Sequence, residues 1–151
     1  MGLQIAADRF IEFPQQVALD RTNRGGDFLN WEPLPLTRHV ESAKAADPVN
    51  VLGELDEAIR GNLQAHASAI VQRYGQLGYE SRAIFDLLRR YAISEDGALH
   101  AEKFFRTVTE EFSATRALFR WRQLCALARV TASEYGRPAA GVAESKELLA
   151  V

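Results

Sequence analysis

PVNVLGELDEAIRGNLQAHASAIVQRY, residues 48–74, is the stretch of sequence that decides the fold class. Asp47 is a good N-cap and Pro48 a good first helical residue. Gly75 and Gly78 are typical of a helix end. Within the stretch, apolar residues and one histidine recur every three or four positions, which places them on one face of an α-helix: Leu52, Leu55, Ile59, Leu63, His66, Ile70 and Tyr74. We therefore predict one continuous amphipathic helix from Pro48 to about Tyr74.

Two glycines, Gly53 and Gly61, lie inside this predicted helix. Each costs about 1 kcal/mol of helix stability relative to alanine. We interpret them as positions where another helix could approach closely.

Four more helical segments follow, separated by turn residues, at about 80–93, 98–112, 116–135 and 143–149. In the third of these, Ala117, Trp121, Leu124, Cys125 and Ala128 share an apolar face. The connections are short, so consecutive helices should pack antiparallel. The sequence thus predicts an all-α domain over residues 47–151. Two architectures remain open for it, an antiparallel helical bundle and a short α-solenoid of helical hairpins.

Residues 1–46 differ from the rest of the chain, because turn residues and prolines interrupt every apolar run. We predict an extended apolar N-terminal arm, which either wraps the chain's own helices or binds a second copy or a larger protein partner. The candidate partner-binding residues are Phe28, Trp31, Leu34 and Leu36.

Composition excludes several classes of function. The chain has 151 residues, 47% of them hydrophobic, and a net charge of -2, so we expect neither nucleic acid nor a membrane surface as a partner. It has no apolar run long enough for a transmembrane helix and no signal peptide pattern, which favours a cytoplasmic protein. Cys125 is the single cysteine and is expected to be a small core residue. Arginine outnumbers lysine by 15 to 3, which indicates a GC-rich bacterial genome.

The histidines are the candidates for metal or cofactor chemistry. His66 lies on the apolar helix face, and His100 follows Asp96 by four residues at the start of a helix. Two histidines and a carboxylate that converge in space can hold a transition metal. The alternative is that His66 is a core histidine bonded to a carbonyl group or water. The sequence does not identify a cofactor, and His39 is expected at the surface.

One basic stripe lies along the predicted helix 116–135, and Arg116, Arg120 and Arg122 form its candidate anion-binding set. The alternative is a solvated face whose arginines pair with acids of the first helix, such as Asp56 and Glu57.

Residues 84–104, IFDLLRRYAISEDGALHAEKF, resemble a segment of bacterial helical modules. Such modules occur in questin oxidase-like proteins and in chains that also carry a Rieske iron–sulfur domain. The similar region covers about residues 50–135. The resemblance implies an all-α fold, an oxidative metabolic setting and a site role for His100. This chain is shorter and lacks the Rieske cysteine–histidine pairs, so it cannot hold that cluster itself.

Two functions therefore stay open. The first is a helical interaction module or small accessory subunit that binds through its N-terminal arm, and its finer form is a subunit of a redox enzyme system. The second is a small metal- or cofactor-dependent oxidoreductase with a site between helices at His66 and His100.

Overall fold

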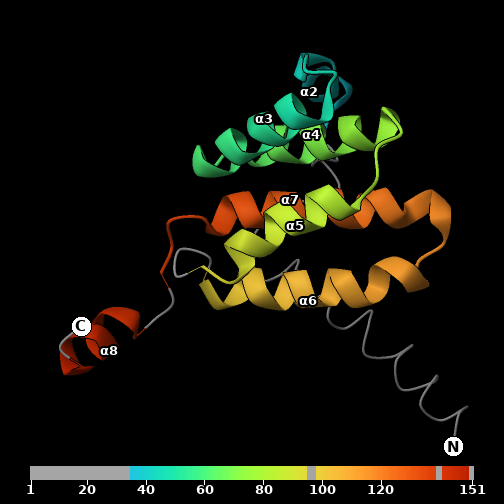
Figure 1. The fold of residues 1–151 in the computed structure, drawn as a ribbon. Helices are drawn as coiled ribbons and strands as arrows, with labels where there is room; N and C mark the ends of the chain where they lie inside the picture. The colour runs from blue at the N-terminus through green and yellow to red at the C-terminus, as the bar shows by residue number, and fades with distance from the viewer. Residues whose placement is uncertain (1–34, 95–97, 139–140, 150–151) are drawn as a thin grey trace, which may run out of the picture. The chain divides into compact units, whose positions relative to one another are not determined.

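The chain forms an all-α bundle in the computed structural model, which describes residues 35–94, 98–138 and 141–149, with only the backbone given for 98–100. Figure 1 shows the order and arrangement of the helices. The elements are α2 (Thr37–Ser42), α3 (Pro48–Arg60), α4 (Gln64–Gln76), α5 (Arg82–Ala92), α6 (Ala98–Ala114), the 3-10 turn η2 (Ala117–Phe119), α7 (Arg120–Glu134) and α8 (Val142–Leu149).

A single hydrophobic core joins α3, α4, α5, α6 and α7. Helix α7 is central, because α3, α4, α5 and α6 all pack against it. The largest fully buried side chains come from four of the five helices: Leu55, Ile59, Ile70, Ile84, Leu88, Leu124 and Leu127. One shared core indicates the bundle rather than a row of separately packed hairpins.

The prediction of one continuous helix over residues 48–74 is wrong, because the chain reverses between α3 and α4 at residues 61–63. Asn62 adopts a left-handed backbone conformation with φ of 52°, which cannot continue a right-handed helix. Its side-chain amide donates hydrogen bonds to the carbonyl oxygens of Ala132 (2.8 Å) and Tyr135 (3.0 Å) at the end of α7. The predicted start is confirmed, since Oδ1 of Asp47 accepts hydrogen bonds from the backbone N–H groups of Val49 and Asn50.

The close approach predicted for the mid-helix glycines occurs at a different glycine. Gly53 has nothing near the position of a Cβ atom, and Gly61 lies at the chain reversal. Gly75, which we expected to end the helix, lies inside α4, directly against the ring of Trp121 in α7. A Cβ atom at Gly75 would stand 2.5 Å from Cδ2 of Trp121. The close packing of α4 on α7 therefore requires glycine at this position.

The later helices match the prediction apart from their boundaries. The helix expected from residue 116 starts at Arg120, after the η2 turn. Ala117 is exposed in that turn, so its predicted place on the apolar face is wrong. Trp121 is half-buried, and Leu124, Cys125 and Ala128 are buried as predicted.

The end of the predicted N-terminal arm also differs from an extended path, since residues 37–42 form α2. This short helix packs on α4. At its start, Nδ1 of His39 accepts a hydrogen bond from the backbone N–H of Leu36 at 3.2 Å and helps to cap the helix. His39 was expected at the surface, but it is half-buried. Residues 1–34, with the rest of the arm, lie outside the described residues.

We expect Gly75→Ala to lower the free energy of unfolding by about 1–3 kcal/mol, because the added methyl group would overpack the contact with Trp121. Gly53→Ala is the matched control. It adds the same methyl group in a helix interior with open space around it, and should stabilise the protein by about 0.5–1 kcal/mol. Urea denaturation followed by circular dichroism measures both changes. A Gly75→Ala protein as stable as the wild type would contradict this packing.

Candidate functional site

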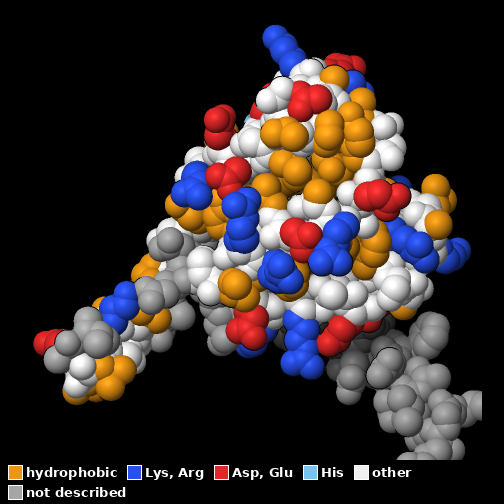
Figure 2. All heavy atoms as spheres, viewed as in Figure 1, with side chains coloured by type: hydrophobic (Ala, Val, Ile, Leu, Met, Phe, Trp, Pro, Cys, Tyr) orange, Lys and Arg blue, Asp and Glu red, His pale blue; other side chains and the backbone are white. Residues whose placement is uncertain are grey.

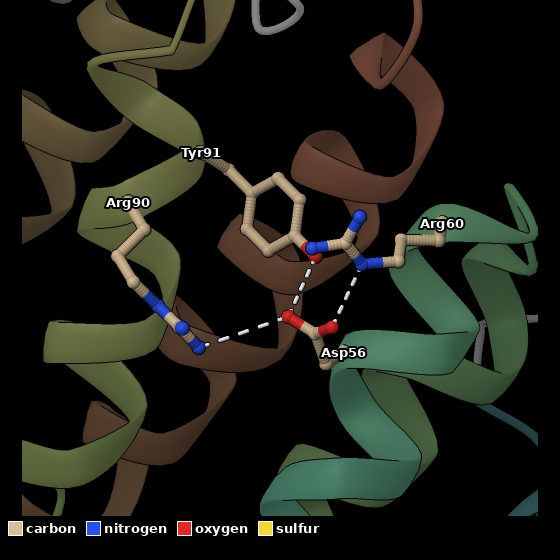
Figure 3. A network of polar contacts seen from close by, with 4 residues as sticks. All are labelled: Asp56, Arg60, Arg90 and Tyr91. Atoms are coloured by element: carbon tan, nitrogen blue, oxygen red, sulfur yellow. Dashed lines mark hydrogen bonds and ion pairs between the residues drawn. The ribbon is translucent and has the colours of Figure 1, made fainter.

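A polar cluster joins α3 to α5 around the carboxylate of Asp56 (Figure 3). Oδ2 of Asp56 accepts a hydrogen bond from Nε of Arg60 at 2.8 Å, and Oδ1 accepts one from the hydroxyl group of Tyr91 at 2.7 Å. Nη2 of Arg90 lies 3.7 Å from Oδ1. The rings of Tyr91 and Tyr135 pack edge to face, with 5.6 Å between their centres. Cζ of Arg60 lies 6.0 Å from the centre of each ring.

The electrostatics of this cluster favour charged Asp56 and protonated Tyr91 and Arg60. Burial alone would raise the pKa of Asp56, but the hydrogen bonds from Arg60 and Tyr91 and the charges of Arg60 and Arg90 outweigh it and lower that pKa. Burial, then the hydrogen bond to Asp56, raises the pKa of Tyr91. The hydrogen bond to Asp56 also raises the pKa of Arg60. At neutral pH these three groups are therefore not poised to exchange a proton, and the contacts of Asp56 with Tyr91 and Arg90 tie α3 to α5.

This cluster is not among the sites predicted from the sequence. The spacing of Asp56 and Arg60, four residues apart on one helix, is a visible signal of an ion pair. The sequence around Asp56 does not indicate its contacts with Tyr91 and Arg90, because these residues lie in another helix, 35 and 34 positions after Asp56.

The three predicted anion-binding arginines divide into two groups. Arg120 is structural, because its guanidinium group donates to the carbonyl oxygens of Thr115 (3.0 Å) and Ser113 (3.3 Å) at the end of α6. Arg116 and Arg122 instead share one aromatic ring, with each Cζ atom 5.0 Å from the centre of the Phe119 ring. We call Arg116, Leu118, Phe119 and Arg122, at the turn from α6 to α7, the basic elbow.

The predicted pairing of these arginines with acids of the first helix does not occur at Asp56, whose carboxylate binds Arg60 and Arg90. Arg116 and Arg122 make no ion pair with any carboxylate in the part of the chain that the structure describes. Their positive charge is available to a partner.

The predicted metal site at His66, His100 and Asp96 stays a prediction. His66 is half-buried in the first turn of α4. His100 is in the first turn of α6 but its side chain is not described, and Asp96 lies outside the described residues. Among side chains that are described, no three histidine, cysteine, aspartate or glutamate residues come together as metal ligands.

Cys125 is confirmed as a core residue. Burial raises the pKa of its thiol to about 12, which leaves no thiolate for nucleophilic chemistry at neutral pH.

A groove of about 600 Å³ runs between α2 and the second half of α4. Thr37, Glu41, Lys44, Gln72 and Gln76 give it a largely polar lining. Arg73 also lines it, and its Nε atom is buried without a hydrogen-bond partner.

No family model, no curated protein and no solved structure matches the chain. Over the described ranges, every helix is too short or too polar to cross a bilayer.

We expect Asp56→Asn to lower the free energy of unfolding by about 1.5–3 kcal/mol at pH 7, because hydrogen bonds to a charged group are lost between partly buried side chains. The lowered pKa of Asp56 means that its stabilisation is complete above the unfolded-state value near 3.8 and disappears as the pH falls through the folded-state pKa. Wild type and variant should therefore become equally stable in acid below that pKa.

Asp86→Asn is the control for this prediction. Asp86 pairs with Arg82 and Arg89 at a more exposed site, and such pairs contribute about 1 kcal/mol or less. Denaturant titrations at a series of pH values measure both variants. If both substitutions lowered the free energy of unfolding equally, the Asp56 cluster would stabilise the bundle no more than an exposed ion pair does.

Proposed function

We propose that this protein is a cytoplasmic helical interaction module or small accessory subunit, which binds a second copy or a larger protein. The observation that carries the proposal is a set of large apolar side chains left exposed on a body whose core is already closed. Val49, Ile93 and Leu118 are each more than three quarters exposed, and Leu63 and Phe104 about half.

The closed core matters to this argument. Leu55, Ile70 and Leu124 have no exposed surface at all, so the bundle does not need the exposed side chains to complete its interior. Figure 2 shows hydrophobic side chains gathered over α3 and α4 on the viewed face, with charged side chains scattered around them. Apolar surface rimmed by charge is typical of protein-binding sites.

The N-terminal arm is the proposed binding segment, with Phe28, Trp31 and Leu34 as its anchors. Aromatic side chains are enriched among the residues that dominate binding energy. Leu36, the fourth predicted anchor, is half-buried on the described body. In its finer form, the proposal is that the partner belongs to a redox enzyme system. The resemblance of residues 84–104 to helical modules of questin oxidase-like proteins supports this form.

We expect Phe28→Asp/Trp31→Asp in the full chain to lower the mass of the assembly in solution, because the copies separate. The helix content should stay unchanged. Sedimentation velocity measures the mass, and far-UV circular dichroism measures the helices. Val17→Asp, elsewhere in the arm, is the control and should leave the mass as it is. Loss of helix content in the double variant would show instead that the arm covers the chain's own helices. An unchanged mass would contradict binding of a second copy through these anchors.

The second candidate function is a small metal- or cofactor-dependent oxidoreductase. The directions in which the helices run support it. Helix α7 is antiparallel to α4, since Trp121 meets Gly75 and Asn62 meets Ala132. Helix α6 is antiparallel to α7 as well (Figure 1). The first turns of α4 and α6, which carry His66 and His100, therefore face the same end of the bundle.

This second function predicts about one equivalent of metal, or a bound chromophore, in protein purified without chelator. His66→Ala and His100→Ala should each remove it without unfolding the protein. His39→Ala, in α2, is the control and should retain it. Elemental analysis and the visible absorption spectrum are the measurements. A colourless, metal-free wild-type protein would exclude the shared histidine site.

A further inference from the structure

The basic elbow gathers positive charge that the bundle does not neutralise. Arg116 and Arg122 lie on the same ring, that of Phe119, at equal distances of 5.0 Å. The nearest acids in the sequence do not compensate them. Glu110 pairs with Arg106, and Glu111 makes no ion pair with either arginine.

Apolar surface lies beside this charge. Leu118 is 82% exposed, the largest value among the big apolar side chains that the structure describes. In Figure 2, basic and hydrophobic side chains lie next to each other at the right-hand end of the view, where Figure 1 shows α6 turning into α7. Arginine and aromatic side chains are enriched at protein interfaces, and the exposed leucine adds apolar area beside them.

Helix α8 carries two glutamates and one lysine, so its net charge is opposite to that of the basic elbow. None of its side chains is buried, and Leu148 and Leu149 are 79% and 70% exposed. Glu144, Glu147 and Leu148 are spaced by three and four residues, so they lie on one face of the helix. That face presents two carboxylates one turn apart next to a leucine, which complements the two arginines and the leucine of the basic elbow.

We propose that α8 of one copy of this chain docks on the basic elbow of a second copy. Glu144 and Glu147 pair with Arg116 and Arg122, and Leu148 packs on Leu118 and Phe119. This interaction surface goes beyond the proposed function, because it involves no residue of the N-terminal arm.

A second copy fits better than the chain's own elbow. The elbow lies at the start of α7, and the 15 residues of α7 span about 22 Å. Beyond α7, the backbone of Tyr135 is held by Asn62, and the N–H of Arg137 bonds to the carbonyl oxygen of Glu134. The four residues 138–141 that remain before α8 reach about 14 Å when fully stretched. Docking within one chain would thus require a stretched link, and docking between copies does not.

The contact is heterologous, since it joins two different surfaces of the same chain. Each copy can offer its α8 and its elbow at once. Two copies can therefore exchange helices reciprocally, or more copies can form a ring.

Two full-length charge-reversal variants test the proposal. In the first, Arg116→Glu/Arg122→Glu makes the elbow acidic like α8, and in the second, Glu144→Arg/Glu147→Arg makes α8 basic like the elbow. Like charges then oppose docking within each variant alone, whereas in a mixture both contacts between unlike copies are complementary. Each variant carries a different fluorophore, energy transfer reports association, and circular dichroism verifies the fold of each.

We expect the mixture to associate at least about tenfold more tightly than either variant with itself, and less tightly as salt is added. Arg129→Glu/Arg137→Glu is the matched control, because it reverses two exposed arginines in and just after α7, away from the elbow. A mixture of this control with the Glu144→Arg/Glu147→Arg variant should associate no more tightly than the control does with itself.

Two results would overturn the proposal. One is a mixture that binds no more tightly than the separate variants. The other is an equal gain with the control pair, which would indicate nonspecific charge attraction. Neither result depends on the anchors of the N-terminal arm, so this proposal and the proposed function can fail separately.

Discussion

The reversal of the chain at Asn62 is the constraint on which the rest of the bundle depends. Its left-handed backbone ends α3, and its side-chain amide binds the carbonyl oxygens of Ala132 and Tyr135, 70 or more residues later in the chain. The same two hydrogen bonds fix the start of α4 against the end of α7. From that point α4 runs antiparallel to α7 until Gly75 meets Trp121, and the two contacts hold the helices together at both ends. The reversal also brings the end of α3 beside α5, where Asp56 reaches Tyr91 and Arg90.

The features that could be predicted from the sequence are those that depend on near neighbours. The N-cap at Asp47, the apolar faces of the helices and the burial of Leu124 and Cys125 follow from spacing and residue type. Leu63, next to Asn62, continues the apolar pattern with helical spacing through the reversal, so the pattern alone indicated one helix. Glycine likewise shows that space is available to a neighbour, but the neighbour of Gly75 is a tryptophan 46 positions away.

The candidate sites show the same limit. Arg116, Arg120 and Arg122 are indistinguishable by composition, yet the bend at η2 turns Arg120 back onto the carbonyl groups of α6 and leaves the other two on Phe119. Asp56 and Arg60 form a pair that spacing can suggest, whereas the hydroxyl group of Tyr91 joins it only because α5 packs beside α3. A residue type therefore indicates what chemistry is available, and the tertiary fold decides whether the bundle uses that chemistry itself.

That distinction separates the arginines by role. Arg60 and Arg120 have their donors matched by a carboxylate and by carbonyl groups, so they stabilise the bundle and offer little to a partner. Arg116 and Arg122 each lie 5.0 Å from the centre of the Phe119 ring, and among the described residues no acid forms an ion pair with either of them, so an anionic group would be attracted to both. The carboxylates of α8 lie on a helix that buries none of its own side chains. In the described part of the chain, neither the arginines of the basic elbow nor Glu144 and Glu147 of α8 form an ion pair, and a contact between copies would bring these opposite charges together.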